Sequence, residues 1–192
     1  MLAKVALGVT TATTVAAGTC AYRLFRKSRT DRLTGLGNRE ALVAAFNRVR
    51  WHRRGLVAVA LGDMNGFKAF NDTHGHRFGD RVLIEVGAVL RHMAFRGEVP
   101  VRLHGDEFAV LIPWVVSADD AERRTRELQA AVATITEIDG QPVEVSMALG
   151  VMTAPAETAQ LSALLGSADD RMYGDKHTTR THNTEHEFSL SQ

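Results

Sequence analysis

Three consecutive residues, Gly105, Asp106 and Glu107, place two carboxylates in a tight turn between apolar runs. The flanking runs, VPVRL (99–103) and FAVLI (108–112), are typical of buried strands, and the Gly-Asp pair predicts a two-residue hairpin turn. A turn alone needs no glutamate, so the carboxylates suggest metal and phosphate chemistry. The alternative is that Gly105 supplies a positive φ, Asp106 forms the turn and Glu107 is merely solvated.

A further carboxylate, Asp63, follows the apolar run 56–61, which predicts a buried strand. One aspartate on each of two adjacent strands suits Mg²⁺, which prefers a few carboxylate oxygens with water and substrate phosphates. His74 and His76 could suggest a zinc pair, but the sequence has no second cluster at ligand spacing, and its one cysteine is Cys20. We interpret them as loop or core histidines.

Four motifs together resemble the GGDEF family of diguanylate cyclases, which condense two GTP molecules into cyclic di-GMP. They are DRLTGLGNR (31–39), DMNGFKAFNDTHGHRFGD (63–80), HGDEF (104–108) and ADDRMYGDK (168–176), and the resemblance covers residues 31–180. It implies a palm-like, ferredoxin-related sheet of the nucleotidyl-cyclase type. The alternation of predicted strands and helices itself favours a two-layer α/β fold with helices packed around a central sheet.

The resemblance implies roles for the acidic side chains. Asp63 and Asp106, with the main-chain carbonyl of Met64, would ligate Mg²⁺, two ions in each active site. Glu107 would lie beside the reacting centre, where a carboxylate can assist deprotonation of a hydroxyl, and Gly105 would complete the catalytic turn.

The same resemblance implies the substrate contacts. Asn71 and Asp80 match guanine-binding positions, where an amide and a carboxylate favour GTP over ATP. Lys176 and Arg180 match positions that hold the triphosphate, and Lys68 is a further basic contact. Each subunit of a homodimer would hold one GTP, and two phosphoryl transfers between facing sites would close the ring.

Three departures from the family pattern bear on activity. His104 occupies the first glycine of the signature. The resemblance places it among the substrate-binding residues, where its imidazole could crowd the nucleotide. Asn65 stands where the family usually has another aspartate, and Phe95 and Glu98 stand where its product-inhibition motif has arginine and aspartate, so that site is expected to be absent. The alternative function is therefore a catalytically inactive GGDEF domain that acts as a GTP-binding or protein-interaction effector.

The N-terminal region predicts a membrane anchor. Residues 5–22 carry no charged side chain and would span about 27 Å as a helix, while the basic residues that follow place the catalytic domain in the cytoplasm. We expect a single-pass protein of the inner or cell membrane, with an anchor and basic segment at 1–30, the GGDEF domain at 31–180 and a disordered tail at 181–192. A cleaved secretory signal and an amphipathic helix packed on the domain are the alternatives.

Composition and periodicity complete these expectations. With 23 basic and 22 acidic residues, two Trp and two Tyr, the chain lacks the basic, aromatic surface of nucleic-acid binders. Apolar spacing predicts helices over 39–53, 78–95, 118–134 and 161–176, with Asn38 as an N-cap, and a strand over 143–152.

Overall fold

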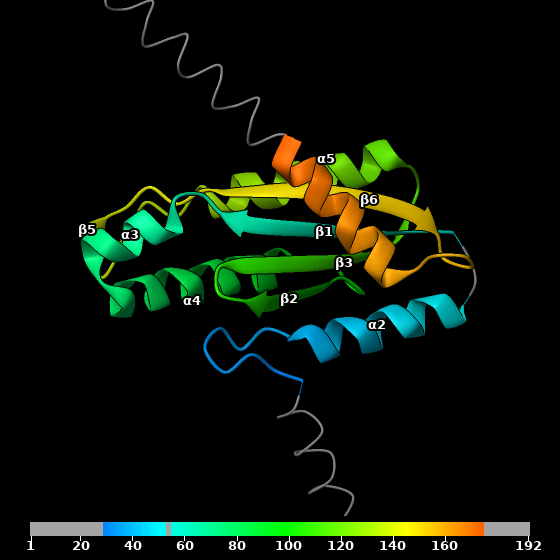
Figure 1. Ribbon diagram of the computed structural model, residues 1–192, viewed down its shortest axis with the longest axis horizontal. Helices are drawn as coiled ribbons and strands as arrows, with labels where there is room; N and C mark the ends of the chain where they lie inside the picture. Colours follow the sequence, from blue (N-terminus) through cyan, green and yellow to red (C-terminus); the bar gives the residue numbers. More distant parts are fainter. Residues whose placement is uncertain (1–28, 53–54, 175–192) are drawn as a thin grey trace, which may run out of the picture.

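The computed structural model describes residues 29–52 and 55–174 (Figure 1). Its elements are α2 (Arg39–Trp51), β1 (Leu56–Met64), α3 (Phe67–His74), α4 (His76–Met93), β2 (Val99–His104), β3 (Glu107–Val115), α5 (Ala118–Val132), β4 (Glu137–Ile138), β5 (Gln141–Pro142) and β6 (Met147–Pro155). A closing helix follows, and residues 161–174 are its described part.

The strands β2, β3, β1 and β6 form one antiparallel sheet in that spatial order, and β4 pairs with β5 in a separate hairpin. Strand β1 lies inside the sheet, with β3 on one side and β6 on the other. The chain order of strand, helices, two strands, helix and strand is that of a ferredoxin-like sheet. The α/β class and the sheet type are therefore as predicted.

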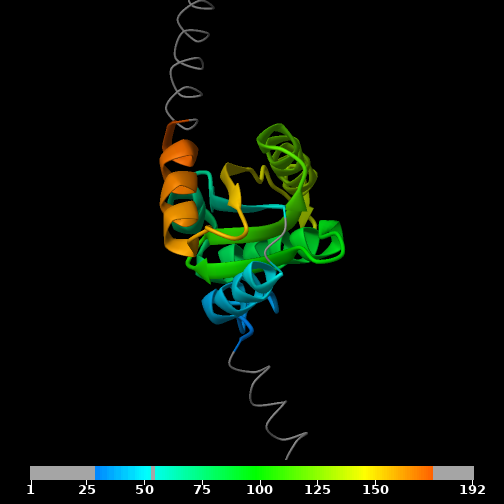
Figure 2. The same cartoon turned by 90° about the vertical axis from the view of Figure 1, so that its right-hand side faces the viewer.

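Helices cover both faces of this sheet. Alternate residues of β1 point to opposite faces: Ala58 and Ala60 pack in a cluster with α4 and α5, while Val57 and Val59 pack in another with α2 and the closing helix. Figure 2 shows the closing helix and α5 on opposite sides of the sheet. The predicted two-layer arrangement is thus corrected to three layers, because a strand buried on both faces needs helices on both.

Local sequence signals account for most element ends. Asn38 caps α2, since its side chain accepts a hydrogen bond from the Ala41 amide at 3.2 Å, and Ser117 caps α5 in the same way. The helix predicted over 78–95 begins earlier, at His76, and Gly75 with its φ of 83° separates it from α3. The strand predicted over 143–152 begins only at Met147.

The localisation prediction needs correction. None of the helices within 29–52 and 55–174 is both long and apolar enough to cross a bilayer. That finding removes the support for a single-pass membrane protein, and we do not retain the prediction. The proposed anchor at 5–22 and the proposed tail at 181–192 lie outside the described residues.

Candidate active site

The signature turn has the predicted form. Gly105 and Asp106 alone connect β2 to β3, and Gly105 has a φ of 51°, a left-handed conformation that favours glycine. His104 and Glu107, on either side of the turn, face each other as the closing pair of the hairpin. The turn therefore carries one carboxylate at its tip and another at its base.

A row of polar side chains crosses three strands beside this turn. Asp63 in β1 is the direct partner of Glu107 in β3, which in turn is the partner of His104 in β2. Leu61 packs on the α2 side of the sheet, so Asp63, two residues later, lies on the same side. The row thus places two carboxylates and an imidazole together at one end of the sheet.

Asp63 and Asp106 interact directly. Burial raises the pKa of Asp106, and a hydrogen bond with Asp63, the charge of Asp63 and the charge of Glu107 raise it further. Two carboxylates this close repel each other when both are ionised, so a bound cation would relieve the repulsion. No group of three His, Cys, Asp or Glu suited to a metal occurs in the described part of the chain. The Asp63 and Asp106 carboxylates are oxygen donors, which fit a hard cation that takes its other ligands from phosphate and water.

Asp31 of the opening motif is linked to the signature turn through hydrogen bonds that were not predicted from the sequence. Arg102 donates from Nε to the Gly105 carbonyl at 2.8 Å and from its guanidinium to Asp31 at 3.2 Å. Asp31 also accepts from the Thr34 amide at 2.9 Å and hydroxyl at 2.7 Å. Burial opposes ionisation of Asp31, but the Thr34 and Arg102 hydrogen bonds outweigh it and lower its pKa. The ionised Asp31 thus anchors the arginine that holds the turn.

The predicted guanine-binding residues lie where α3 meets α4. Asn71 Oδ1 is buried and has no hydrogen-bond partner among the described residues. Gly79 of α4 packs directly against it, because a Cβ at position 79 would lie 1.9 Å from that oxygen. Asp80, the next residue, is exposed. A buried amide oxygen without a partner is costly, and the close packing of Gly79 keeps this one from solvent.

The other predicted residues have varied surroundings. The side chain of Met64 packs in the core beneath α4, while Lys68 is exposed on α3. His74 contacts Phe70 with ring centroids 4.6 Å apart and the ring planes tilted by 35°. Asn65 donates to Ser146 Oγ at 3.0 Å. The asparagine that replaces the family's aspartate is therefore held by the loop before β6. The predicted triphosphate contacts at 176 and 180 lie outside the described residues.

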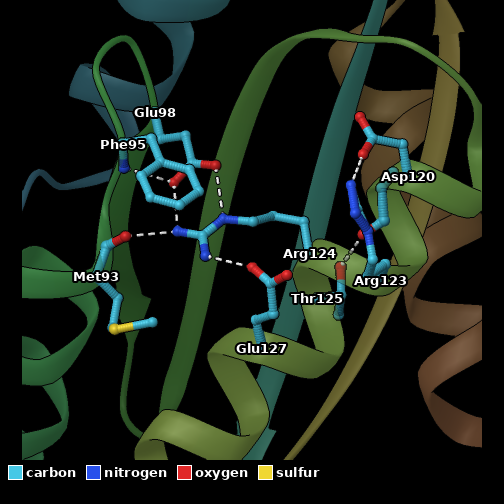
Figure 3. Close-up of polar contacts among 9 residues, drawn as sticks. Met93, Phe95, Glu98, Asp120, Arg123, Arg124, Thr125 and Glu127 are labelled. Atoms are coloured by element: carbon cyan, nitrogen blue, oxygen red, sulfur yellow. Dashed lines mark hydrogen bonds and ion pairs between the residues drawn. The ribbon is translucent and has the colours of Figure 1, made fainter.

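A second polar cluster occupies the turn before β2 (Figure 3). Arg124 of α5 donates to both carboxylate oxygens of Glu98 at 2.9 Å and to Glu127 at 2.9 Å, and its guanidinium lies 3.9 Å from the centroid of the Phe95 ring. It also donates to the Met93 carbonyl. Phe95 and Glu98, which depart from the product-inhibition motif, thus both contact Arg124 of the same chain.

Comparison with known proteins identifies relatives of the whole described domain. The family described as diguanylate cyclase, GGDEF domain, matches residues 28–182. The diguanylate cyclase DgcP of Escherichia coli is 36% identical over 157 residues, which are 80% of this chain and 46% of that protein. TpbB, a diguanylate cyclase of Pseudomonas aeruginosa, is 35% identical over 161 residues, covering 82% and 37%. The chain therefore spans less than half the length of these curated relatives.

Solved structures agree with the sequence comparison. The crystal structure of the GGDEF domain of TpbB from Pseudomonas aeruginosa superposes with a TM-score of 0.69 at 33% identity, covering 76% of this chain and 92% of that one. The coiled coil and GGDEF domain of DgcB from Caulobacter crescentus, in complex with c-di-GMP, gives a TM-score of 0.80 at 23% identity, covering 93% and 96%. At that identity, the second likeness concerns the fold alone.

Proposed function

This chain belongs to the GGDEF family of diguanylate cyclases, and from that premise we propose that it condenses two molecules of GTP into cyclic di-GMP and pyrophosphate. The observation that carries the proposal is the interacting pair Asp63 and Asp106, which lies beside Glu107 at the end of the central strands. Phosphoryl transfer needs this arrangement, because a cation held by carboxylates brings the charged triphosphate to the reacting group.

The residues present fit magnesium. We infer that Asp63, Asp106 and the main-chain carbonyl of Met64 hold Mg²⁺, with two ions in each site. When bound, the metal supplies positive charge that offsets the triphosphate and the leaving pyrophosphate. Both carboxylates are held in place, since Asp63 lies near the end of a strand inside the sheet and Arg102 holds the carbonyl of Gly105 beside Asp106.

Asn71 and Asp80 supply the preference for guanine. The amide of Asn71 and the exposed carboxylate of Asp80 lie close together in sequence at the meeting of α3 and α4, and the carboxylate can accept from the amino group or N1–H of the base. Adenine lacks the N1–H donor and would leave an acceptor unpaired, so it would bind less well. Gly79 provides the space in which the Asn71 amide lies.

The reaction joins two bound nucleotides. The 3′-hydroxyl oxygen of one GTP bonds to the α-phosphorus of the other, the bond from that phosphorus to the β-phosphate bridging oxygen breaks, and pyrophosphate leaves. Glu107 takes the hydroxyl proton, while Lys68, Lys176 and Arg180 bind the triphosphate. A second transfer closes the ring. Since each subunit holds one GTP, the active species is a homodimer with its two sites facing each other.

Feedback inhibition at the turn before β2 is not expected. Glu98 has both oxygens on Arg124, and Phe95 carries no charge that could bind a phosphate. We therefore propose that added cyclic di-GMP does not inhibit the enzyme through this turn. Product inhibition measured against GTP at fixed Mg²⁺ tests this. An inhibition that Arg124→Met or Glu98→Gln relieves would contradict it.

Mass spectrometry of the products tests the function. The full-length protein, shown to be dimeric by light scattering, is incubated with GTP and Mg²⁺, and Asp106→Asn is compared with the exposed control Asp119→Asn. Cyclic di-GMP from the wild type and the control, but not from Asp106→Asn, supports the proposal. GTP binding by a dimer that makes no product would instead support the alternative, an inactive effector domain, which the intact carboxylate pair does not favour.

A further inference from the structure

His104 contacts the glutamate of the signature turn. Its Nε2 lies 3.1 Å from Glu107 Oε2, within hydrogen-bonding distance. The two residues are direct partners at the end of the β2–β3 hairpin, and the side chains of such a pair project from the same face of the sheet. The side chains are 68% and 38% exposed, so the pair borders solvent rather than the core.

Glu107 has unlike neighbours on its two sides. Across β1 it faces Asp63, whose carboxylate interacts with that of Asp106, and across β2 it faces the imidazole of His104. The charge of Glu107 contributes to the raised pKa of Asp106, so the three carboxylates repel one another. The imidazole is the neighbour in the row that can donate a hydrogen bond to Glu107.

Without such a partner, a glutamate this exposed would sample several rotamers. Glutamate has three rotatable side-chain bonds, and fixing them costs conformational entropy. A hydrogen bond to an ionised carboxylate is among the stronger ones available, and it selects the rotamers that bring Oε2 to the imidazole. The contact therefore restricts where the second oxygen of Glu107 can lie.

We propose that His104 is a positioning residue, which holds the Glu107 carboxylate in place for the attacking 3′-hydroxyl. The inference rests on the proposed cyclase function and deepens it. The ring that could crowd a nucleotide is instead directed at Glu107. In this role Nε2 is the donor and Oε2 of Glu107 the acceptor, and His104 acts on the reaction through Glu107.

Steady-state kinetics of the full-length dimer with GTP and Mg²⁺ separate positioning from substrate binding. His104→Gly removes the contact, His104→Gln keeps a side-chain N–H of similar reach, and His92→Gln is the matched control, an exposed histidine at the end of α4. We expect His104→Gly to lower kcat about five- to ten-fold with KM for GTP changed less than about two-fold, since one charge-assisted contact is lost. His104→Gln should recover most of that kcat, and His92→Gln should match the wild type.

Two kinetic results would overturn the inference. One is a His104→Gly variant that turns over as fast as the wild type or faster, which would mean that the imidazole does not assist Glu107. The other is a raised KM with unchanged kcat, which would assign His104 to the substrate. Failure of His104→Gln to exceed His104→Gly in kcat would also count against a donor role.

A spectroscopic readout separates this inference from the proposed function. In ¹⁵N-labelled protein without nucleotide, long-range proton–nitrogen spectra should show a proton on His104 Nε2, and Glu107→Gln should shift that resonance while leaving His92 unchanged. An unshifted His104 resonance would overturn the contact even in an active enzyme. A wild type that makes no cyclic di-GMP but shows the shift would refute the cyclase function and leave the contact standing.

Discussion

Replacing Arg124 by methionine should destabilise the protein strongly. The guanidinium makes hydrogen bonds to Glu98 and Glu127, and only 7% of the Arg124 side chain and 5% of the Glu98 side chain are exposed. The Glu98 hydrogen bonds raise the pKa of Arg124 more than its burial lowers it, so it remains charged at any ordinary pH. Methionine fills a similar volume but leaves the buried carboxylate of Glu98 without its cation.

The expected loss of stability follows from the Glu98 carboxylate, which the substitution leaves buried without a cation. Removing one partner of a buried ion pair typically costs about 3 to 5 kcal/mol. The Phe95 amide, which donates to Glu98 at 2.9 Å, compensates only in part. For a chain of this length each kcal/mol lowers the melting temperature by about 2 to 4 °C, so Arg124→Met should melt roughly 6 to 20 °C below the wild type.

Urea denaturation of the full chain, followed by circular dichroism, measures the loss. Arg123→Met is the matched control, since its side chain is 59% exposed and pairs with Asp120 at the surface, and it should cost less than about 1 kcal/mol. The double variant Arg124→Met with Glu98→Met should regain most of the stability, because the buried charge is gone. The reasoning is refuted if Arg124→Met costs no more than Arg123→Met, or if the double variant is no more stable than the single one.

Three further outcomes are expected. In metal-free buffer at pH 7, Asp106→Asn should raise the melting temperature while abolishing product formation, because burial and Asp63 disfavour the ionised Asp106; calorimetry with chelator present checks this. Gly79→Ala should raise KM for GTP about ten-fold by displacing the Asn71 amide, as initial-rate kinetics would show. Asp31→Asn should cost roughly 2 kcal/mol at pH 7. Because the folded-state pKa of Asp31 is lowered from 3.8, its contribution is present above that pH and is lost as pH falls further, so urea titrations of both proteins should converge in acid.

The parts of the site that could be predicted from the sequence are those where a local sequence pattern and the chemistry of the residues indicate the same structure. The hairpin turn needs only Gly105, Asp106 and two apolar runs, and strand alternation then places Asp63 and Glu107 on one face once β1 and β3 pair. The resemblance to the GGDEF family is confirmed by the match over residues 28–182. The roles of individual side chains remain predictions that the proposed variants test.

The contacts that the sequence did not predict join distant segments. Arg102 and Asp31 are 71 positions apart, and Arg124 and Glu98 are 26 apart and belong to different elements, so no helical or strand period links them. The charged run DDAERRTRE (119–127) in α5 has the composition of a solvated face. Arg124 lies instead on the buried side of that helix, because Glu98 and Met93 supply acceptors there.

Gly150 lets the closing helix pack closely against β6. A Cβ there would lie 2.0 Å from the Ala168 carbonyl oxygen and 2.5 Å from the Met172 nitrogen, and these backbone atoms cannot turn aside as a flexible side chain can. Any larger residue would therefore push the helix away from β6. This strand pairs along its whole length with β1, and its residue Ala148 lies opposite Asp63. Close packing at Gly150 therefore fixes where the described part of this helix, residues 161–174, lies against the sheet that carries Asp63. The position of the closing helix against the sheet thus depends on one helix–strand contact, although glycine itself contributes no chemistry.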